Sequence, residues 1–244
     1  MRHENTDDSD EIREIRLAVA RLCAQFPGAY WRKLDREAGY PTEFVAALTE
    51  AGYLSVLIPE AYGGAGLTLS AAAAVLEEIQ KAGANGAACH AQMYIMGSLL
   101  RHGSDAQKSR YLPQIASGAL RLQAFGVTEP GSGSDTTSIT TFAERRGDHF
   151  VVNGQKVWTS RAEHSDLMLL LARTTAKDKA AKRTEGLSVF IVDMKQALTA
   201  GMTIRPIRTM MNHSTTEVFF DNVVVPAENL IGEEGMAFAI SCPA

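Results

Sequence analysis

A glycine-rich segment at residues 125–135 carries the residue types best suited to holding a ligand. It reads Phe-Gly-Val-Thr-Glu-Pro-Gly-Ser-Gly-Ser-Asp and separates a helical first half of the chain from a strand-rich second half. Gly131 and Gly133 can adopt positive φ and let the backbone approach a ligand closely, and Pro130 stiffens the turn before them. Exposed N–H groups beside hydroxyl side chains suit a ligand rich in carbonyl or phosphate oxygens. The hydroxyl side chains are those of Thr128, Ser132 and Ser134.

Two familiar phosphate-binding motifs do not fit this segment. A P-loop requires a lysine directly after its last glycine, whereas Ser134 follows Gly133. A dinucleotide fingerprint requires a further glycine where Thr136 stands, together with a strand–helix–strand unit. Composition alone therefore leaves open an ordinary glycine- and serine-rich loop between two domains.

A second segment, residues 151–160, reads Val-Val-Asn-Gly-Gln-Lys-Val-Trp-Thr-Ser. The Asn-Gly pair at 153–154 predicts a two-residue hairpin turn, and the returning strand then delivers Trp158, Thr159 and Ser160 to its far end. An indole beside two hydroxyls suits an aromatic heterocycle. Taken alone, Trp158 fits a core residue at the end of a strand better than a ligand contact.

Together the two segments resemble the acyl-CoA dehydrogenase family of flavoproteins, over about residues 12–235. The stretches most specific to that family are Thr-Glu-Pro-Gly-x-Gly-Ser-Asp at 128–135 and Lys-x-Trp-Thr-Ser at 156–160. Further similar stretches lie at 59–64, 216–221 and 225–229. The match is close.

The resemblance implies an α+β fold in which an N-terminal all-α helical bundle domain, residues 1–122, precedes a β domain. That domain, residues 123–232, is expected to be an antiparallel β-sandwich or barrel that binds FAD and acyl-CoA. Residues 233–244 look like the start of the family's third, helical domain, and the rest of that domain is missing here. A truncation, a shifted reading frame or a deliberate fragment would each account for this.

The resemblance also implies which residues contact the cofactor and the substrate. Phe125, Val127 and Thr128 are expected on one side of the FAD ring, and Trp158, Thr159 and Ser160 on the other. Ser134 is expected to serve the cofactor phosphates and the bound acyl-CoA. Phe125 stands where the family often has tyrosine, and Ser160 where it commonly has threonine.

The resemblance assigns no catalytic residue to this chain. The family's catalytic base is a glutamate of the missing helical domain, and no residue here matches it by motif. Glu129 lies beside the glycine-rich loop, but nothing in its spacing directs it at a substrate carbon. We therefore expect the chain alone to be catalytically weak or inactive.

The implied activity is FAD-dependent α,β-dehydrogenation of an acyl-CoA thioester to the trans-2-enoyl-CoA. An electron-transfer flavoprotein or a similar protein is the implied electron acceptor. Members of the family are homo-oligomeric, although the tetramer is built largely from the missing domain. Two alternatives remain: a non-catalytic flavin- or acyl-CoA-binding fragment, and an acyl-CoA oxidase or flavin monooxygenase on the same scaffold.

Composition places the chain among globular proteins. With 45% hydrophobic and 21% charged residues it can bury a sizeable core, and its net charge of −4 makes nucleic acid a poor partner. Cys23, Cys89 and Cys242 have neither metal-site nor disulfide spacing. The acidic, polar N-terminus does not resemble a signal peptide, and no apolar run approaches the roughly 18 residues of a membrane span. These features predict a cytoplasmic protein with no metal and no membrane association.

Hydrophobic periodicity gives the expected elements. The first helix should begin near Asp10, Ser70 should cap a helix ending near residue 81, and Ser104 and Gln107 fit a capping box. Further helices are expected at 30–37, 42–52, 87–102 and 105–111. Strands are expected at 139–145, 149–152, 155–158, 167–173, 187–193, 202–207, 216–221 and 223–225. The basic loop at 174–185, with Lys177, Lys179, Lys182 and Arg183, is expected to be solvated rather than to contact coenzyme A phosphates.

Overall fold

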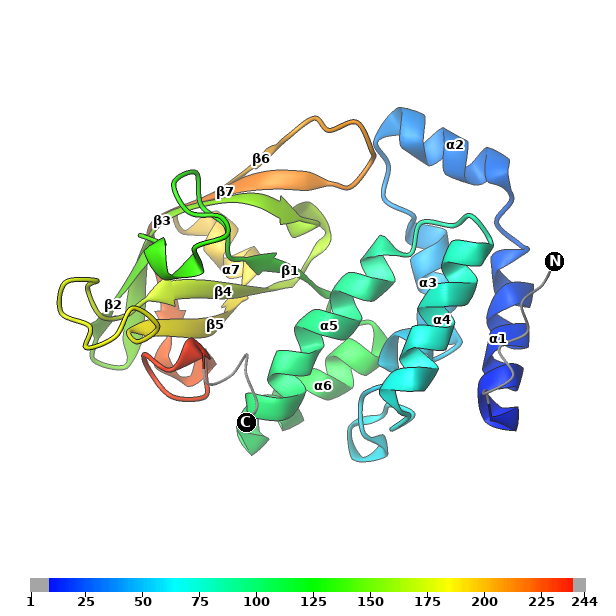
Figure 1. The fold of residues 1–244 in the computed structure, drawn as a ribbon, viewed down its shortest axis with the longest axis horizontal. Coiled ribbons are helices and arrows are strands. Elements are labelled where there is room, and N and C mark those ends of the chain that lie inside the picture. The colour runs from blue at the N-terminus through cyan, green and yellow to red at the C-terminus, as the bar shows by residue number, and fades with distance from the viewer. Residues whose placement is uncertain (1–8, 239–244) are drawn as a thin grey trace.

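A computed structural model describes residues 9–238, with helices in the first half of the chain and a sheet in the second (Figure 1). The predicted order of a helical region followed by a sheet-rich region is confirmed. The helices of the first half are α1 (Asp10–Cys23), α2 (Gly28–Glu37), α3 (Thr42–Glu50), α4 (Leu69–Lys81), α5 (Ala87–His102) and α6 (Asp105–Ser117).

The ends of two helices show how local sequence sets their limits. The side chain of Ser104 accepts a hydrogen bond from the backbone N–H of Gln107, whose own side chain accepts from the backbone of Ser104, so the predicted capping box is confirmed. The prediction of Ser70 as the cap of α4 is wrong. Thr68 caps that helix by accepting from Ala71 N at 3.3 Å, two residues earlier than expected. Helix α6 also runs past the expected end at residue 111, because its apolar face continues into the core.

The capping box gives the first testable prediction. We expect Ser104→Ala to lower the free energy of unfolding by about 1 kcal/mol, because the N–H of Gln107 loses its acceptor. Urea denaturation followed by circular dichroism measures the change. Ser70→Ala is the matched control, since Ser70 is exposed inside α4, and it should be nearly neutral. Equal losses for the two variants would contradict the assignment of the caps.

The second half of the chain forms a single eight-stranded sheet in the order β6-β7-β3-β2-β4-β5-β8, with β1 paired to β4. Its strands are β1 (Leu122–Gly126), β2 (Phe142–Arg146), β3 (His149–Ser160), β4 (Leu167–Arg173), β5 (Leu187–Asp193), β6 (Met202–Pro206), β7 (Thr215–Pro226) and β8 (Leu230–Ile231). A short helix, α7 (Met194–Thr199), follows β5. The sheet is mixed rather than antiparallel throughout, because β1 runs parallel to β4, and β2 meets β4 in parallel at Phe142 and Arg173.

The hairpin turn predicted at 153–154 is wrong. Strand β3 passes through these residues, and its register against β7 shifts between Val152 and Gly154, where Gly154 has φ of 149°. Strand β7 bulges at the same level: Asn222 has φ of 53°, and its N–H donates to Asn153 Oδ1 at 2.9 Å. The Asn-Gly pair therefore forms a paired bulge that lets two long strands continue, rather than reversing the chain.

The core is divided by the sheet into layers. Leucines of α5 and α6, such as Leu99 and Leu112, pack against Leu169 and other residues on one face of the sheet, and a separate apolar cluster that includes Phe150 and Phe190 covers the other face. Every residue of β4 is buried, as in strands covered on both faces. A third cluster lies within the helical bundle. The strand β1, which leads into the glycine-rich loop, is thus held between α5 and the sheet.

Candidate functional site

The structure brings the two segments singled out in the sequence into direct contact. The N–H of Val157, one residue before Trp158, donates to the carbonyl of Thr128 at 2.9 Å. Thr128 follows the end of β1, and Trp158 lies near the end of β3. The glycine-rich loop and the tip of β3 therefore form one continuous surface.

Trp158 is turned outward by a second irregularity in β3. The register against β7 shifts between Lys156 and Thr159, and Trp158 within that shift has φ of 61°. Positive φ is uncommon for a residue with a bulky side chain and marks a locally strained position. The indole is 59% exposed. This bulge presents a broad aromatic face to solvent at a point where strand alternation alone would not predict one.

The other predicted site residues differ in their accessibility. Phe125, Val127, Thr128 and Ser160 are half-buried, and Ser134 is exposed. Thr159 is buried, and its hydroxyl has no hydrogen-bond partner among the described residues. Of the two adjacent hydroxyls, that of Ser160 is therefore the one open to a ligand.

The loop also presents backbone donors. Within residues 9–238, the N–H groups of Val127, Thr128, Gly133 and Ser134 have no acceptor. Gly131 and Gly133 could adopt positive φ, but neither does so here. A Cβ at either position would meet no atom within 4 Å. These glycines leave open space around the loop instead of forming a tight turn. Free donors beside an exposed indole fit a ligand that combines an aromatic ring with carbonyl or phosphate oxygens.

A buried ion pair between Lys156 and Glu129 holds the glycine-rich loop against β3. Lys156 Nζ donates to Glu129 Oε1 at 2.8 Å and to the carbonyl of Val127 at 3.0 Å, and the two charged side chains are 0% and 5% exposed. Gly126 makes room for the lysine stem, because a Cβ there would lie 3.2 Å from Lys156 Cγ. The pair ties the backbone next to Thr128 to the strand that carries Trp158.

Glu129 is saturated by donors. Besides Lys156, it accepts from Thr140 N at 2.6 Å, Thr140 Oγ1 at 2.8 Å and Thr141 N at 2.9 Å. Burial raises the pKa of Glu129, but the charge of Lys156 and these hydrogen bonds outweigh it and lower the pKa to about 2. Glu129 is thus a permanently ionised structural carboxylate. It is poorly suited to accept a proton, which agrees with leaving it out of the catalytic assignment.

The basic loop at 174–185 lies against the end of the glycine-rich segment. Arg183 pairs with Asp135 at 2.5 Å, and Lys177 donates to Ser138 Oγ at 3.3 Å. The side chains of this loop's lysines are exposed. The loop is solvated, as expected, and part of its charge is already shared with Asp135.

Sequence reasoning missed three buried cations of this region, Lys156, Arg161 and Arg173. A signal for Lys156 was present: it occupies a position in β3 between apolar neighbours, and Glu129 is the acidic residue of the facing loop. No comparable signal marks Arg161. Among residues 9–238, no three His, Cys, Asp or Glu side chains gather closely enough to hold a metal ion. None of the described helices combines the length and apolar character that crossing a bilayer requires.

Comparison with known families decides the relationship. Residues 9–119 match the model described as "Acyl-CoA dehydrogenase, N-terminal domain", and residues 124–223 match "Acyl-CoA dehydrogenase, middle domain". The chain belongs to the acyl-CoA dehydrogenase family. Members of this family are FAD-dependent flavoproteins and oxidoreductases. FAD combines an aromatic ring with carbonyl and phosphate oxygens, which is the kind of ligand that an exposed indole beside free N–H donors fits.

The chain spans little more than half the length of the acyl-CoA dehydrogenases that it matches. Glutaryl-CoA dehydrogenase of Desulfococcus multivorans is 36% identical over 91% of the chain, which spans 56% of that protein. Mitochondrial isovaleryl-CoA dehydrogenase of Pongo abelii is 32% identical over 93% of the chain, which spans 54% of it. A solved glutaryl-coenzyme A dehydrogenase in complex with glutaryl-CoA superposes with a TM-score of 0.86 at 30% identity, covering 98% of this chain and 60% of that one.

Proposed function

We propose that this chain is the flavin- and substrate-binding part of an FAD-dependent acyl-CoA dehydrogenase, which converts an acyl-CoA thioester to the trans-2-enoyl-CoA. The single observation that supports this most strongly is the 2.9 Å hydrogen bond from Val157 to Thr128, which joins the glycine-rich loop to the strand tip that carries Trp158. A single ring system can reach both segments because they are neighbours.

Different residues of the chain are proposed to contact different parts of FAD. Phe125 and Trp158 offer aromatic surface to the flavin ring, and the free N–H groups of Val127 and Thr128 suit its carbonyl oxygens. Ser160 offers a hydroxyl to the same ring, and the exposed Ser134 is placed for phosphate groups of FAD or acyl-CoA. When bound, FAD supplies the acceptor for the hydride that leaves the substrate's β carbon.

The proton from the α carbon needs a base that we do not assign to any of these 244 residues. Glu129 is excluded by its low pKa and its four donors. We therefore propose that these residues bind FAD and acyl-CoA but do not complete turnover by themselves. We also propose an electron-transfer flavoprotein as the electron acceptor of the enzyme, and a boundary between the helical and β domains at residues 122 and 123.

The test is to purify the 244-residue chain, saturate it with FAD and record its visible spectrum. We expect a bound flavin spectrum that does not bleach on anaerobic addition of acyl-CoAs, and that bleaches with dithionite as the control for a reducible cofactor. Absence of flavin binding would overturn the assignment of the site. Bleaching by an acyl-CoA would overturn the proposal that the base lies outside these residues.

A further inference from the structure

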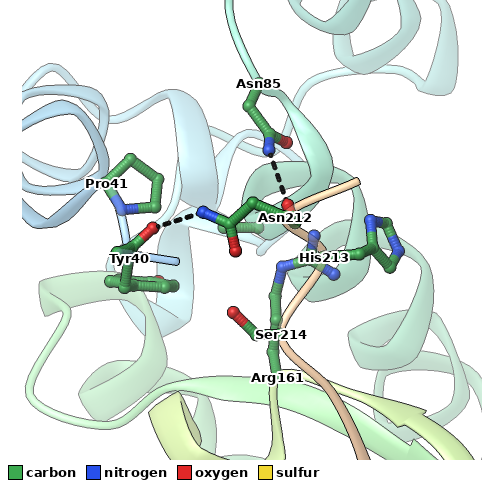
Figure 2. A pocket seen from close by; sticks show the side chains of 9 residues that line it. Tyr40, Pro41, Asn85, Arg161, Asn212, His213 and Ser214 are labelled. Atoms are coloured by element: carbon green, nitrogen blue, oxygen red, sulfur yellow. Dashed lines mark hydrogen bonds between the residues drawn. The ribbon is translucent and has the colours of Figure 1, made fainter. Parts of the chain in front are cut away.

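A buried arginine without a charged partner lies where the helical region meets the sheet. Arg161 directly follows β3, has φ of 58° and is 5% exposed. It lines a small, partly open pocket (Figure 2). The other residues of this pocket, which we call the Arg161 pocket, are Gly39, Tyr40, Pro41, Asn85, Ala88, Asn212, His213 and Ser214.

Three hydrogen bonds hold the main chain at Arg161. Its N–H donates to the carbonyl of Ser214 at 2.8 Å, and its carbonyl accepts from His164 N at 3.1 Å and Ser165 Oγ at 3.0 Å. Figure 2 shows the side chain rising from the sheet toward Asn212 and His213, and it draws no hydrogen bond to the guanidinium. The main chain at Arg161 is thus held in place, and the guanidinium has no hydrogen-bond partner among the described residues.

No carboxylate among residues 9–238 lies within ion-pair distance of Arg161. The titratable groups close enough to influence the pKa of Arg161 are Tyr40, Cys89 and Tyr94. These are neutral near neutral pH, since burial raises the pKa of each. In the same pocket, burial and then the charge of Arg161 lower the pKa of His213. Arg161 is thus the single fixed charge among the residues that line the pocket.

Burying the Arg161 guanidinium without a counter-charge lowers the stability of the fold unless a bound anion neutralises it. A guanidinium stays protonated in proteins, and a buried charge without a counter-charge is strongly destabilising. Most neighbouring donors are already used: Asn212 Nδ2 donates to Gly39 O at 2.8 Å, and Asn85 Nδ2 donates to Asn212 O at 3.4 Å. The hydroxyl of Ser214 has no partner among the described residues. The guanidinium fork and this hydroxyl are available to one ligand.

We propose that the Arg161 pocket is a carboxylate-binding site. A planar carboxylate matches the planar guanidinium fork and is compact enough for a small pocket. The carboxylate can come from a free small acid or from the far end of an acyl group that ends in a carboxylate. Only the second source rests on the proposed function.

The first experiment needs neither FAD nor coenzyme A. Glutarate and its neutral counterpart glutaramide are titrated into the 244-residue chain at constant ionic strength, with melting temperature and heat of binding as readouts. We expect saturable binding and a rise in melting temperature with glutarate alone. Arg161→Gln should abolish both effects, and its melting temperature without ligand should equal or exceed that of the wild type, because the uncompensated charge is gone. Arg208→Gln, which removes an exposed arginine from the loop between β6 and β7, should bind glutarate normally.

Three results would overturn the proposal: no saturable binding of glutarate to the wild type, an equal response in Arg161→Gln, or a marked loss of stability in that variant without ligand. A second titration separates the two sources by comparing glutaryl-CoA with valeryl-CoA. A carboxylate delivered by the substrate predicts that the wild type prefers glutaryl-CoA by about tenfold and that Arg161→Gln loses this preference. Equal affinities assign the site to a free acid. Failure of both thioesters to bind would refute the proposed function while the glutarate titration still decides the site.

Discussion

We expect Glu129→Gln to lower the free energy of unfolding by about 3 kcal/mol or more, because it leaves the charge of Lys156 buried without its anion. Lys156 is 0% exposed and has two acceptors, Glu129 Oε1 and the carbonyl of Val127. The amide keeps the shape of the glutamate but not its charge, so the loss measures electrostatics rather than packing. Urea denaturation of the purified chain measures the change.

Matched variants distinguish the cost of an unpaired buried charge from a general sensitivity of the fold to substitution. Lys156→Met alone should be similarly harmful, whereas the double change Glu129→Gln with Lys156→Met should recover much of the loss, since no buried charge remains and the glutamine carbonyl still accepts from Thr140 or Thr141. Arg146→Gln breaks an ion pair with Glu144 whose side chains are 58% and 56% exposed, and it should cost less than about 1 kcal/mol. Equal effects at the buried and exposed pairs would contradict the role given to Lys156.

The same carboxylate gives a pH signature. The pKa of Glu129 is lowered from 4.5 to about 2 in the folded chain. A lowered folded-state pKa contributes stability that is present above the unfolded value and is lost as the pH falls toward the folded value. The contribution of Glu129 should therefore disappear between about pH 4.5 and pH 2, and the acid side of the stability curve should be shallower in Glu129→Gln.

The second large effect is expected at Trp158, where ligand affinity should change and stability should not. Trp158→Ala should weaken FAD binding by tenfold or more, because the flavin ring loses an aromatic face, and stacking contacts of this kind contribute about 1.5 kcal/mol or more. The indole is 59% exposed, so its removal should leave the unfolding midpoint nearly unchanged. Titration of FAD, followed by quenching of its fluorescence, measures the affinity.

The control for Trp158 is another exposed apolar side chain on the same sheet-rich half. Met210 is fully exposed in the loop between β6 and β7, and Met210→Ala should change neither FAD affinity nor stability. Trp158→Phe should recover part of the affinity, since a smaller aromatic face remains. If Trp158→Ala binds FAD as the wild type does, the flavin does not rest on this strand tip.

Sequence reasoning was most successful where one strong local signal determines the structure. The capping box of Ser104, the helix at 87–102 and the apolar strands at 167–173 and 187–193 are found as expected. The two segments that resemble the family's motifs are neighbours in space. Their roles toward the cofactor remain predictions, as do the domain boundaries.

The wrong or missing predictions occur where contacts between distant segments decide the structure. An Asn-Gly pair favours a turn, but β7 bulges at Asn222 opposite it and keeps both strands paired. Thr68 instead of Ser70 caps α4, since both residue types suit a cap and only the fold selects between them. The burial of Arg161 depends on the loop at 207–214 and on helix α5, which lie far from it in sequence, so no local pattern could indicate it.

The parallel pairing of β1 with β4 links the assembly of the candidate site to the folding of the β region. Leu122 pairs with Leu167, so the glycine-rich loop and the tip of β3 lie within the segment of chain that this pairing closes. Contacts between segments so distant in sequence form slowly compared with helices. We therefore expect a refolding molecule to form its helices first and to gain the ability to hold a cofactor when these long-range strand contacts close.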